Sequence, residues 1–241
     1  MLLTTATTQL MIATARVTNP NLTSSEFNNW YNSVLLPGFM ENHNVSLSVR
    51  YKLIPPANVT VPKAPAWDYL TLYKAHPNVS STSAAFMGRA VEGSGISFTK
   101  RDIGPNDVAI EITTWNPIQT FEGLREKKGQ VPSGRPKVVV MVKIEPKEGG
   151  DNIVEEWYRK QHLDMLSMLP NYRRSTRYRS ADGSKPRWLA IHEMDSTYMD
   201  PYQGEVLMGT ELARNVMDGV KVFEASQWEV IFEKGNLTEK L

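Results

Sequence analysis

A histidine and a tyrosine lie one helical turn apart in Val154–Leu169, which reads VEEWYRKQHLDMLSML. Residues three and four apart share one face of a helix, so a helix here places His162 and Tyr158 among apolar side chains. An imidazole, with an ordinary pKa of about 6.5, exchanges protons at neutral pH, and a phenol can polarise a carbonyl or hold an enolate oxygen. His162 is therefore a candidate general acid or base, and Tyr158 a candidate partner for the substrate oxygen. The alternative is a core helix whose polar groups are satisfied by hydrogen bonds. The full stripe is Val154, Trp157, Tyr158, Gln161, His162, Met165, Leu166 and Leu169.

A second histidine, His192, falls in the strand expected at residues 188–194. It can act as a further acid or base, or as a hydrogen-bond donor to substrate, if it shares with Trp188 the face that meets the helix. The opposite phase, which turns Leu189 and Ile191 toward the helix, is equally apolar. The sequence leaves this choice open.

Charged residues near these histidines have less specific interpretations. Glu193 and Asp195 flank His192 and are candidates to orient its ring, whereas Asp164 points to a different face of the helix from His162. Four arginines of the preceding strand would suit an acidic substrate, but basic residues occupy two equivalent positions in the first half. A structural or solvent-facing role is therefore expected for Arg173, Arg174, Arg177 and Arg179.

Aromatic and apolar residues complete the candidate site. Trp157 and Trp188 are expected to pack in the core and, secondarily, to stack on a substrate. Met165 and Leu166 are candidates for the apolar part of a substrate site. Two further histidines lie beside turn residues and are expected to be surface or turn histidines: His43 and His76.

Composition limits the class of partner. The 241 residues carry a formal net charge of +1 and no cysteine. Such a charge provides no net field to attract nucleic acid or an anionic membrane, and the lack of cysteine fits a reducing compartment. Five N-x-S/T sequons are present, but residues 1–16 lack the basic start and apolar core of a signal peptide, and no apolar run is long enough to span a membrane. We expect a soluble cytoplasmic monomer or homodimer that binds a small hydrophobic molecule.

The first half alternates strands and helices in the order βαββαβ. The clearest signal is a period-two alternation of apolar and polar residues over 45–53. A capping box at Thr23–Glu26 begins a helix that Pro37 and Gly38 are expected to end. The other expected elements are strands 10–17, 67–74 and 108–115, a helix at 80–91, and loops at 54–65 and 92–105.

The second half follows the same order after a connector at residues 117–136, which begins with a short amphipathic segment over 117–128. Strand 138–144 precedes the helix that carries His162. The remaining expected elements are strands 172–179 and 188–194 around the turn ADGSKP, a helix at 206–218 weakened by Gly209, and a closing strand at 228–233.

The two halves align as an internal repeat. Residues 10–52 placed over 137–179 without a gap give seven identities that fall in the same elements, and Trp67 is then expected to correspond to Trp188. A duplicated unit predicts an α+β fold in which residues 1–116 and 137–241 each form a sheet with helices on one face, and the two sheets pack together. The identical pairs are Trp30 and Trp157, Tyr31 and Tyr158, Leu36 and Leu163, Asn44 and Asn171, Ser48 and Ser175, Arg50 and Arg177, and Tyr51 and Tyr178.

The segment WYRKQHLDMLSMLPNYRRSTRYR, with Trp188 opening the next strand, resembles the EthD-like branch of the dimeric α+β barrel superfamily. The resemblance covers nearly all of the second half and reaches the first half only through the repeat. It implies two tandem ferredoxin-like βαββαβ units that pair their sheets into a barrel within one chain. The superfamily includes cofactor-free polyketide cyclases, lactone isomerases, anthrone monooxygenases, decarboxylases, haem-handling enzymes and small stress-response proteins, and fungal relatives of this branch often look like tailoring enzymes of secondary metabolism. Fold alone does not choose among these activities.

The differences between the halves indicate where the chemistry lies. His162 stands opposite Leu35, and His192 is expected to stand opposite Thr71. Neither histidine has a counterpart in the first copy. We therefore expect one working site, between the helix and the sheet of the second half.

Motifs for metals and nucleotides are missing from the sequence. There is no HExxH, no pair of histidines at ligand spacing and no acidic calcium loop, and the run EGSG at residues 92–95 lacks the spacing and the helix of a phosphate-binding loop. The sequence thus predicts a cofactor-free acid–base enzyme that cyclises, dehydrates, decarboxylates or isomerises a polyketide-like or related metabolite. The alternatives are a cofactor-free monooxygenase of the anthrone type and a non-catalytic ligand-binding or stress-response protein.

Overall fold

The computed structural model describes residues 8–43, 45–55, 67–75, 103–104 and 106–241, which group into two compact units. Unit 1 runs to Asn116 and includes Val230–Leu241, and unit 2 comprises Pro117–Glu229. The helix expected at 80–91, most of the loop expected at 92–105, and His76 lie outside the described residues. Among the described helices, none has both the length and the apolar composition that a membrane crossing requires.

The described residues form eight strands whose hydrogen-bonded order closes as an antiparallel barrel, β1-β3-β2-β8-β5-β7-β6-β4. Helices accompany the strands in both units, so the architecture mixes α and β structure as expected. The strands are β1 (Gln9–Val17), β2 (Val45–Ile54), β3 (Tyr69–Ala75), β4 (Val108–Glu122), β5 (Val138–Pro146), β6 (Tyr172–Ser180), β7 (Trp188–Met194) and β8 (Val220–Gly235).

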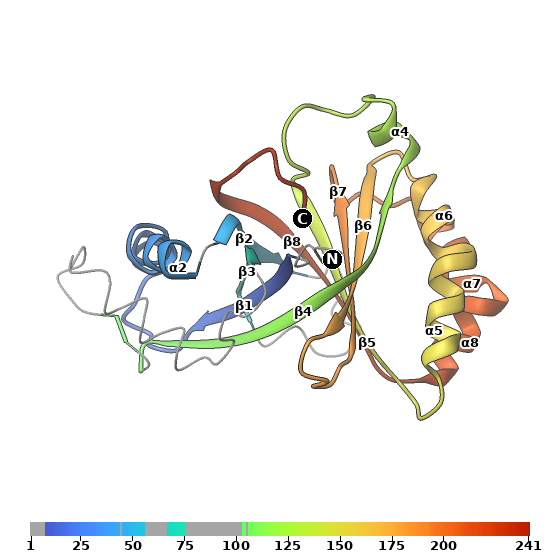
Figure 1. Cartoon of the computed structure of the whole chain (residues 1–241), viewed down its shortest axis with the longest axis horizontal. Coiled ribbons are helices and arrows are strands. Elements are labelled where there is room, and N and C mark those ends of the chain that lie inside the picture. Colours follow the sequence, from blue (N-terminus) through green and yellow to red (C-terminus); the bar gives the residue numbers. More distant parts are fainter. Residues whose placement is uncertain (1–7, 44, 56–66, 76–102, 105) are drawn as a thin grey trace, which may run out of the picture. The chain divides into compact units, whose positions relative to one another are not determined.

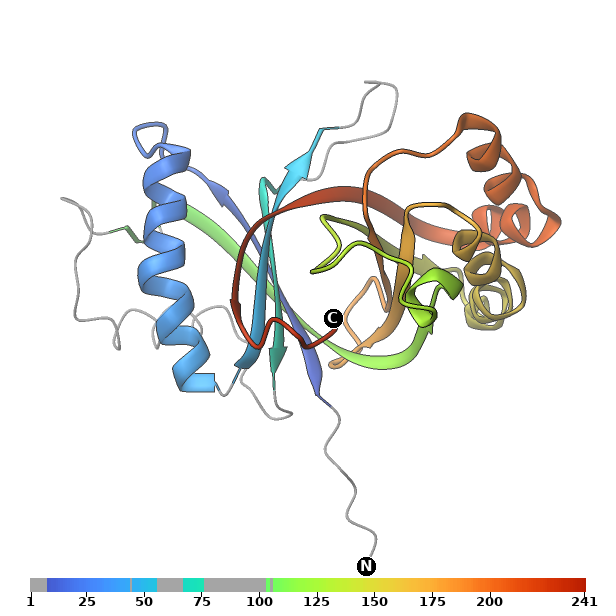
Figure 2. The same cartoon turned by 90° about the horizontal axis from the view of Figure 1, so that it is seen from above.

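Unit 1 packs one long helix against the sheet of β1, β2 and β3 (Figure 2). The helix consists of α1 (Ser24–Trp30), a π turn η1 (Tyr31–Leu35) and α2 (Leu36–His43). The predicted capping box is confirmed, because Thr23 caps α1 and Glu26 bonds back to the Thr23 backbone. The prediction that Pro37 and Gly38 end the helix is wrong. The π turn already interrupts the regular hydrogen-bond ladder immediately before Pro37, so the missing N–H of the proline falls where the ladder is broken.

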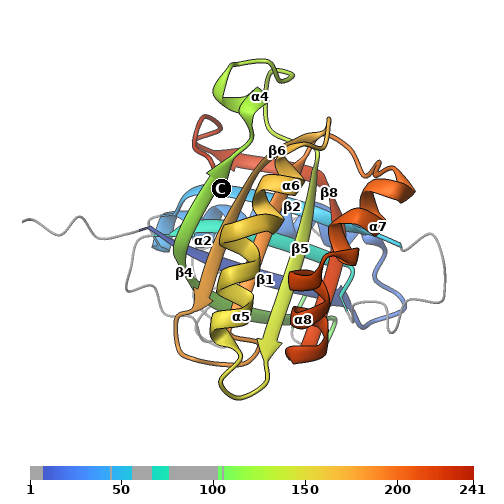
Figure 3. The same ribbon diagram turned by 90° about the vertical axis from the view of Figure 1, so that its right-hand side faces the viewer.

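Unit 2 repeats this arrangement with a second interrupted helix. It consists of α5 (Asp151–Trp157), a π turn η2 (Tyr158–His162) and α6 (Leu163–Ser167), and it lies across the strands of unit 2 (Figures 1 and 3). Helix α8 (Glu211–Gly219) lies beside α5 (Figure 3). Apolar residues of α5, β5, β7 and α8 share one core, which includes Trp157, Tyr158 and Trp188.

Three sequence expectations about element ends need correction. Strand β4 continues to Glu122, so the first half of the expected amphipathic segment at 117–128 is strand, and only Leu124–Lys127 forms a helix, α4. The helix expected at 206–218 is two helices, α7 (Pro201–Gly209) and α8, because Thr210 lies between them and its hydroxyl caps α8 by accepting from the Ala213 N–H. Strand β8 begins at Val220, eight residues earlier than the expected strand at 228–233.

Candidate functional site

The π turn of unit 2 begins at Tyr158 and ends at His162. Its wider hydrogen bond, from the Leu163 N–H to the Tyr158 carbonyl, adds a residue to one helical turn. Both side chains face the core: Tyr158 is 2% exposed and His162 is 7% exposed. Their rings meet edge to face with centroids 5.4 Å apart, and the imidazole stacks on Trp157 at 3.9 Å.

Strand β7 brings His192 to the same place. The phase that the sequence left open is settled, because Trp188 and Ala190 pack in the core beneath the helix. His192 follows on that face, and its ring centroid lies 6.4 Å from Tyr158 and 6.1 Å from His162. The three residues predicted to carry chemistry therefore form one cluster, which we call the Tyr–His–His cluster.

Polar atoms of this cluster lack hydrogen-bond partners. The Tyr158 hydroxyl, His162 Nδ1 and His192 Nε2 are buried and unpartnered within the described part of the chain. Buried polar groups are almost always hydrogen-bonded in native proteins, so each exception calls for an explanation. Three such atoms on three adjacent rings are the arrangement expected of a site that binds a polar ligand.

Burial sets the protonation states of the cluster. Desolvation, reinforced by His192, lowers the pKa of His162 to about 3. Desolvation, reinforced by the positive charge of Arg177, lowers the pKa of His192 to about 4. The pKa of Tyr158 is raised by desolvation, which Arg177 partly opposes. At neutral pH the cluster therefore presents two neutral imidazoles and one protonated phenol.

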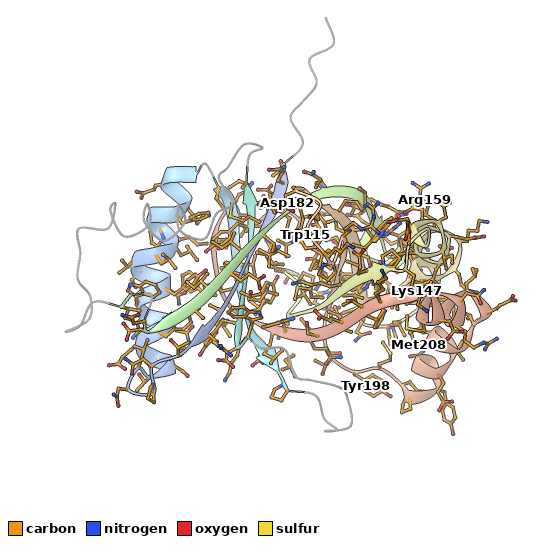
Figure 4. All side chains as sticks on the ribbon, turned by 90° about the horizontal axis from the view of Figure 1, so that it is seen from below. Trp115, Lys147, Arg159, Asp182, Tyr198 and Met208 are labelled. Carbon is orange, nitrogen blue, oxygen red and sulfur yellow. The ribbon has the colours of Figure 1, made fainter. Side chains whose placement is uncertain are left out.

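Arg177 is the nearest buried charge to the cluster. It is 1% exposed, and its guanidinium carbon lies 4.6 Å from the Tyr158 ring centroid. Its Nη2 donates to Glu155 at 2.5 Å, and its Nη1 donates to Gln119 at 2.6 Å. Glu155 also pairs with Arg159, which projects from the outer side of the helix (Figure 4). A cation over the phenol favours negative charge on its oxygen and on a ligand oxygen held there.

The residues predicted to contact substrate differ in burial and in whether they contact the Tyr–His–His cluster. Trp157, Trp188 and Leu166 are buried, and Met165 is half-buried. Trp157 contacts the cluster directly through its stacking on His162. Trp188 is engaged elsewhere, because its indole N–H donates to Asp151 at 2.7 Å and Arg179 covers its ring at 3.9 Å. Packing accounts for Trp188 in this structure.

The acidic residues proposed to orient an imidazole have other partners. Asp195 accepts from Arg173 at 2.7 Å, and Glu193 forms a buried ion pair with Arg174. Ser175 takes the role instead, with its Oγ 2.6 Å from His192 Nδ1. The cluster of arginines is structural, since each also pairs with a carboxylate: Arg173 with Asp195, Arg174 with Glu193, Arg177 with Glu155 and Arg179 with Asp151.

Sequence reasoning overlooked Ser175 as a site residue and treated Arg177 only as part of a basic strand. Both were visible as identities between the halves, Ser48 with Ser175 and Arg50 with Arg177. The site was predicted from residues that differ between the halves, so residues that both halves share were not assigned to it.

Strand register corrects the expected counterpart of His192. Ser175 lies opposite His192 in β6 and β7, and Ser48 lies opposite Tyr73 in β2 and β3. His192 therefore corresponds to Tyr73 and not to Thr71. By the same register Trp188 corresponds to Tyr69, since Trp67 precedes the strand. Matching one tryptophan to another had shifted the alignment by two residues.

At the corresponding positions of unit 1 the polar groups bond to each other. The Tyr31 and Tyr73 hydroxyls hydrogen-bond to each other at 2.8 Å, and the π turn ends at Leu35 where unit 2 has His162. Arg50 covers the Tyr31 ring at 4.0 Å, as Arg177 covers Tyr158. Unit 1 thus keeps the scaffold but holds a tyrosine pair and a leucine where unit 2 has Tyr158, His192 and His162.

No cluster of metal-binding type was found within the described ranges, where no three histidine or acidic side chains gather closely enough to hold an ion. The donors of the Tyr–His–His cluster are two imidazoles and a phenol. Their chemistry is that of proton transfer and hydrogen bonding.

Comparison with known proteins finds a distant relative in sequence and solved structures with the same fold. No family model matches the chain. Core atranone cluster (CAC) protein 1 of Stachybotrys chlorohalonatus is 24% identical over 221 residues, which cover 83% of this chain and 87% of that protein.

Solved structures with the same fold share little sequence. A mutant chlorite dismutase from Candidatus Nitrospira defluvii, in complex with cyanide, has a TM-score of 0.59 at 12% identity, with 95% of this chain and 93% of that chain covered. An anthrone oxidase-like protein has a TM-score of 0.54 at 11% identity, with 97% and 95% covered. The fold is similar to that of dimeric α+β barrel proteins. At these identities the likeness concerns the fold alone.

Proposed function

We propose that this chain is an acid–base enzyme that acts on an aromatic or polyketide-like secondary metabolite at the Tyr–His–His cluster, without a cofactor in the chemical step. One observation carries the proposal: Tyr158, His162 and His192 bring three unpartnered buried polar atoms together in unit 2, whereas unit 1 closes or replaces the same positions. In this proposal the enzyme is cytoplasmic, works as a monomer or homodimer, and takes a small hydrophobic substrate.

The proposed step is removal of a proton next to a carbonyl group. The Tyr158 hydroxyl donates a hydrogen bond to the carbonyl oxygen, and a neutral imidazole takes the proton from the adjacent carbon or hydroxyl. The resulting enolate can attack a second carbonyl, expel a β-hydroxyl that leaves as water with the proton held by the imidazolium, or be reprotonated elsewhere. Decarboxylation of a β-keto acid would reach the same enolate by loss of carbon dioxide in place of the proton. A buried imidazolium is unfavourable alone, and the positive charge of Arg177 adds to its cost at His192. The enolate charge beside the ring offsets part of that cost, and the Arg177 guanidinium behind the phenol stabilises the enolate.

The distant relative supports a role in secondary metabolism. It is named for the core atranone cluster of a fungus, which fits an enzyme of secondary metabolism. We further propose that the two units are copies of one ferredoxin-like unit of the EthD-like type, covering residues 1–116 and 137–241. The π turns and the strand bulges, which stand at matching places in both units, support this duplication.

A proton-exchange assay tests the proposal. The methylene of anthrone lies in the same ring as the carbonyl, which acidifies it through the flanking aromatic rings, and its exchange for deuterium can be followed by NMR under nitrogen. The protein should accelerate exchange, and His162→Leu together with His192→Gln should reduce the acceleration by about a hundredfold or more. His43→Gln serves as the control variant. If the double variant exchanges anthrone as fast as the wild-type protein, the assigned residues do not perform the chemistry.

A cofactor-free monooxygenase is the second candidate, favoured by the anthrone oxidase-like structure among those of the same fold. It would begin with the same proton removal and then require oxygen. Conversion of anthrone to the quinone in air, dependent on His162 and His192, would select this candidate. A non-catalytic binding protein would instead bind anthrone without accelerating exchange or oxidation.

A further inference from the structure

The two imidazoles of the Tyr–His–His cluster differ in their access to solvent. His162 is 7% exposed; its Nδ1 is buried without a partner, and its Nε2, which no hydrogen bond holds within the described residues, lies at the exposed edge of the ring. His192 has no such edge, because its Nε2 is buried and its Nδ1 lies 2.6 Å from Ser175 Oγ. A protonated imidazole carries hydrogen on both nitrogens. Water can therefore hydrate one N–H of a protonated His162, but neither N–H of a protonated His192.

The neighbouring charges favour the same histidine. Arg177 is permanently charged, and together with burial it lowers the pKa of His192. His192 opposes a proton on His162 only while it carries one itself, and with a pKa of about 4 it is uncharged at neutral pH. At neutral pH, burial is therefore the main obstacle to a charge on His162, whereas both burial and Arg177 oppose a charge on His192.

Trp157 covers one face of the His162 ring. The indole and the imidazole stack with ring centroids 3.9 Å apart and planes 29° apart. The face of an indole attracts a cation that lies within about 6 Å of its centroid, more strongly than the face of a phenol or a benzene ring. Unit 1 keeps the tryptophan as Trp30, but Leu35 stands at the histidine position, so that indole has no imidazole to cover. The tryptophan is thus shared by both units, whereas its contact with an imidazole belongs to unit 2.

We propose that Trp157 is a positioning residue that makes His162, and not His192, the base of the reaction. The inference rests on the proposed function and divides its roles. The C–H bond beside the substrate carbonyl breaks, its electron pair remains in the enolate, and the proton bonds to Nδ1 of His162. The imidazolium then lies against the Trp157 face with its Nε2–H toward water. His192 stays neutral and hydrogen-bonds the substrate.

Single substitutions in the anthrone exchange assay separate the two histidines. His162→Leu should lose about a hundredfold of the acceleration, as the double variant does, because it removes the base. His192→Gln keeps a hydrogen-bonding side chain and should lose about tenfold or less. The reverse ranking would overturn this inference while the proposed function stood. A double variant as fast as the wild-type protein would overturn the proposed function itself.

Substitutions of Trp157 test the stack. Trp157→Leu should lower the maximal exchange rate about tenfold, because the imidazolium loses its cation–π partner, and should leave the half-saturating anthrone concentration unchanged. Trp157→Phe keeps a ring face and should recover part of the rate, although it lacks the indole N–H. Trp30→Leu, the matching change in unit 1, should alter neither value. A raised half-saturating concentration at an unchanged maximal rate would show that Trp157 contacts the substrate instead, and equal rates in the two Trp157 variants would exclude a role for the ring face.

Nitrogen-15 NMR of histidine-labelled protein locates the charge without turnover. The stable anion 2,4-dinitrophenolate stands in for the enolate, and 2,4-dinitroanisole is its neutral counterpart. The anion should convert His162 to the imidazolium and leave His192 neutral, with His192→Gln assigning the signals, and the anisole should leave both rings neutral. Trp157→Phe should weaken binding of the anion but not of the anisole. An imidazolium at His192, or none at either ring in the presence of the anion, would overturn the inference.

Discussion

Replacement of His162 by leucine should change how stability depends on pH. The folded protein holds this imidazole neutral, because burial lowers its pKa to about 3, whereas the unfolded chain takes up a proton below about pH 6.5. The stability contributed by the neutral ring is therefore complete above that pH, and is lost as the pH falls toward the folded value. Leucine is the residue that unit 1 carries at the end of its own π turn, Leu35.

The size of the effect follows from proton linkage. Between about pH 7.5 and about pH 5, one histidine that titrates only in the unfolded chain lowers the free energy of unfolding by about 2 kcal/mol. His192, whose pKa is about 4, contributes a similar loss over the same range. The free energy of unfolding of His162→Leu should therefore gain about 2 kcal/mol relative to wild type on going from the higher to the lower pH.

Urea denaturation at both pH values, followed by tryptophan fluorescence and circular dichroism, measures this change. An effect of the substitution that is equal at both pH values does not influence the test, because the test compares the change in the free energy of unfolding between the two pH values. His43→Gln, at the last residue of α2, is the control and should show no such pH-dependent difference. If His162→Leu differs from wild type by the same free energy at both pH values, within about 0.5 kcal/mol, the imidazole is not desolvated as described.

Substitutions at four further positions should lower the free energy of unfolding measured by urea denaturation at neutral pH. Arg177→Met should cost about 3 kcal/mol, because it removes a buried guanidinium that donates to Gln119 and Glu155. Glu155→Gln should cost less than about 2 kcal/mol, because the matching Arg50 of unit 1 is held by the amide oxygens of Asn28 and Asn32. Equal losses would contradict this comparison. Gly235→Ala should cost at least about 2 kcal/mol, since its φ is +100° and a Cβ would lie 2.3 Å from the Ser46 carbonyl oxygen, and a neutral result would mean that β8 does not end there as described. Thr23→Ala should cost about 1 kcal/mol by removing the capping box of α1, and Thr23→Ser, which keeps the hydroxyl, should recover most of it.

Local sequence patterns predicted the elements whose signals are local. The alternation over 45–53 became β2, and Trp188–Met194 became β7 with the expected bounds. The errors fall at element ends whose position depends on the backbone conformation of neighbouring residues. Pro37 reads as a helix end unless the π turn before it is known, and Pro117 reads as a strand end although β4 continues past it.

The residues of the candidate site were predictable from the sequence, but the hydrogen bonds between them and their neighbours were not. His162 and His192 stood out because the first half carries other residues at their positions, and the structure brings them together with Tyr158. The contacts of Ser175 with His192 and Tyr172 were not predictable, because the placement of Tyr172 depends on a bulge at the start of β6 that leaves no periodic signature in the sequence. Strand register was likewise needed to show that His192 replaces Tyr73.

The π turn amounts to one inserted residue, and that has a consequence for how such a helix can evolve. Because the turn holds one residue more than an α turn, deleting a single residue from Tyr158–His162 would restore regular helical bonding and leave Leu163 and Leu166 on the core face. Deleting a residue from α5 or α6 instead would rotate every side chain beyond it by roughly 100°. The turn is therefore the one part of this helix that can be shortened without loss of the core, and such a deletion would change only the spacing between Tyr158 and His162.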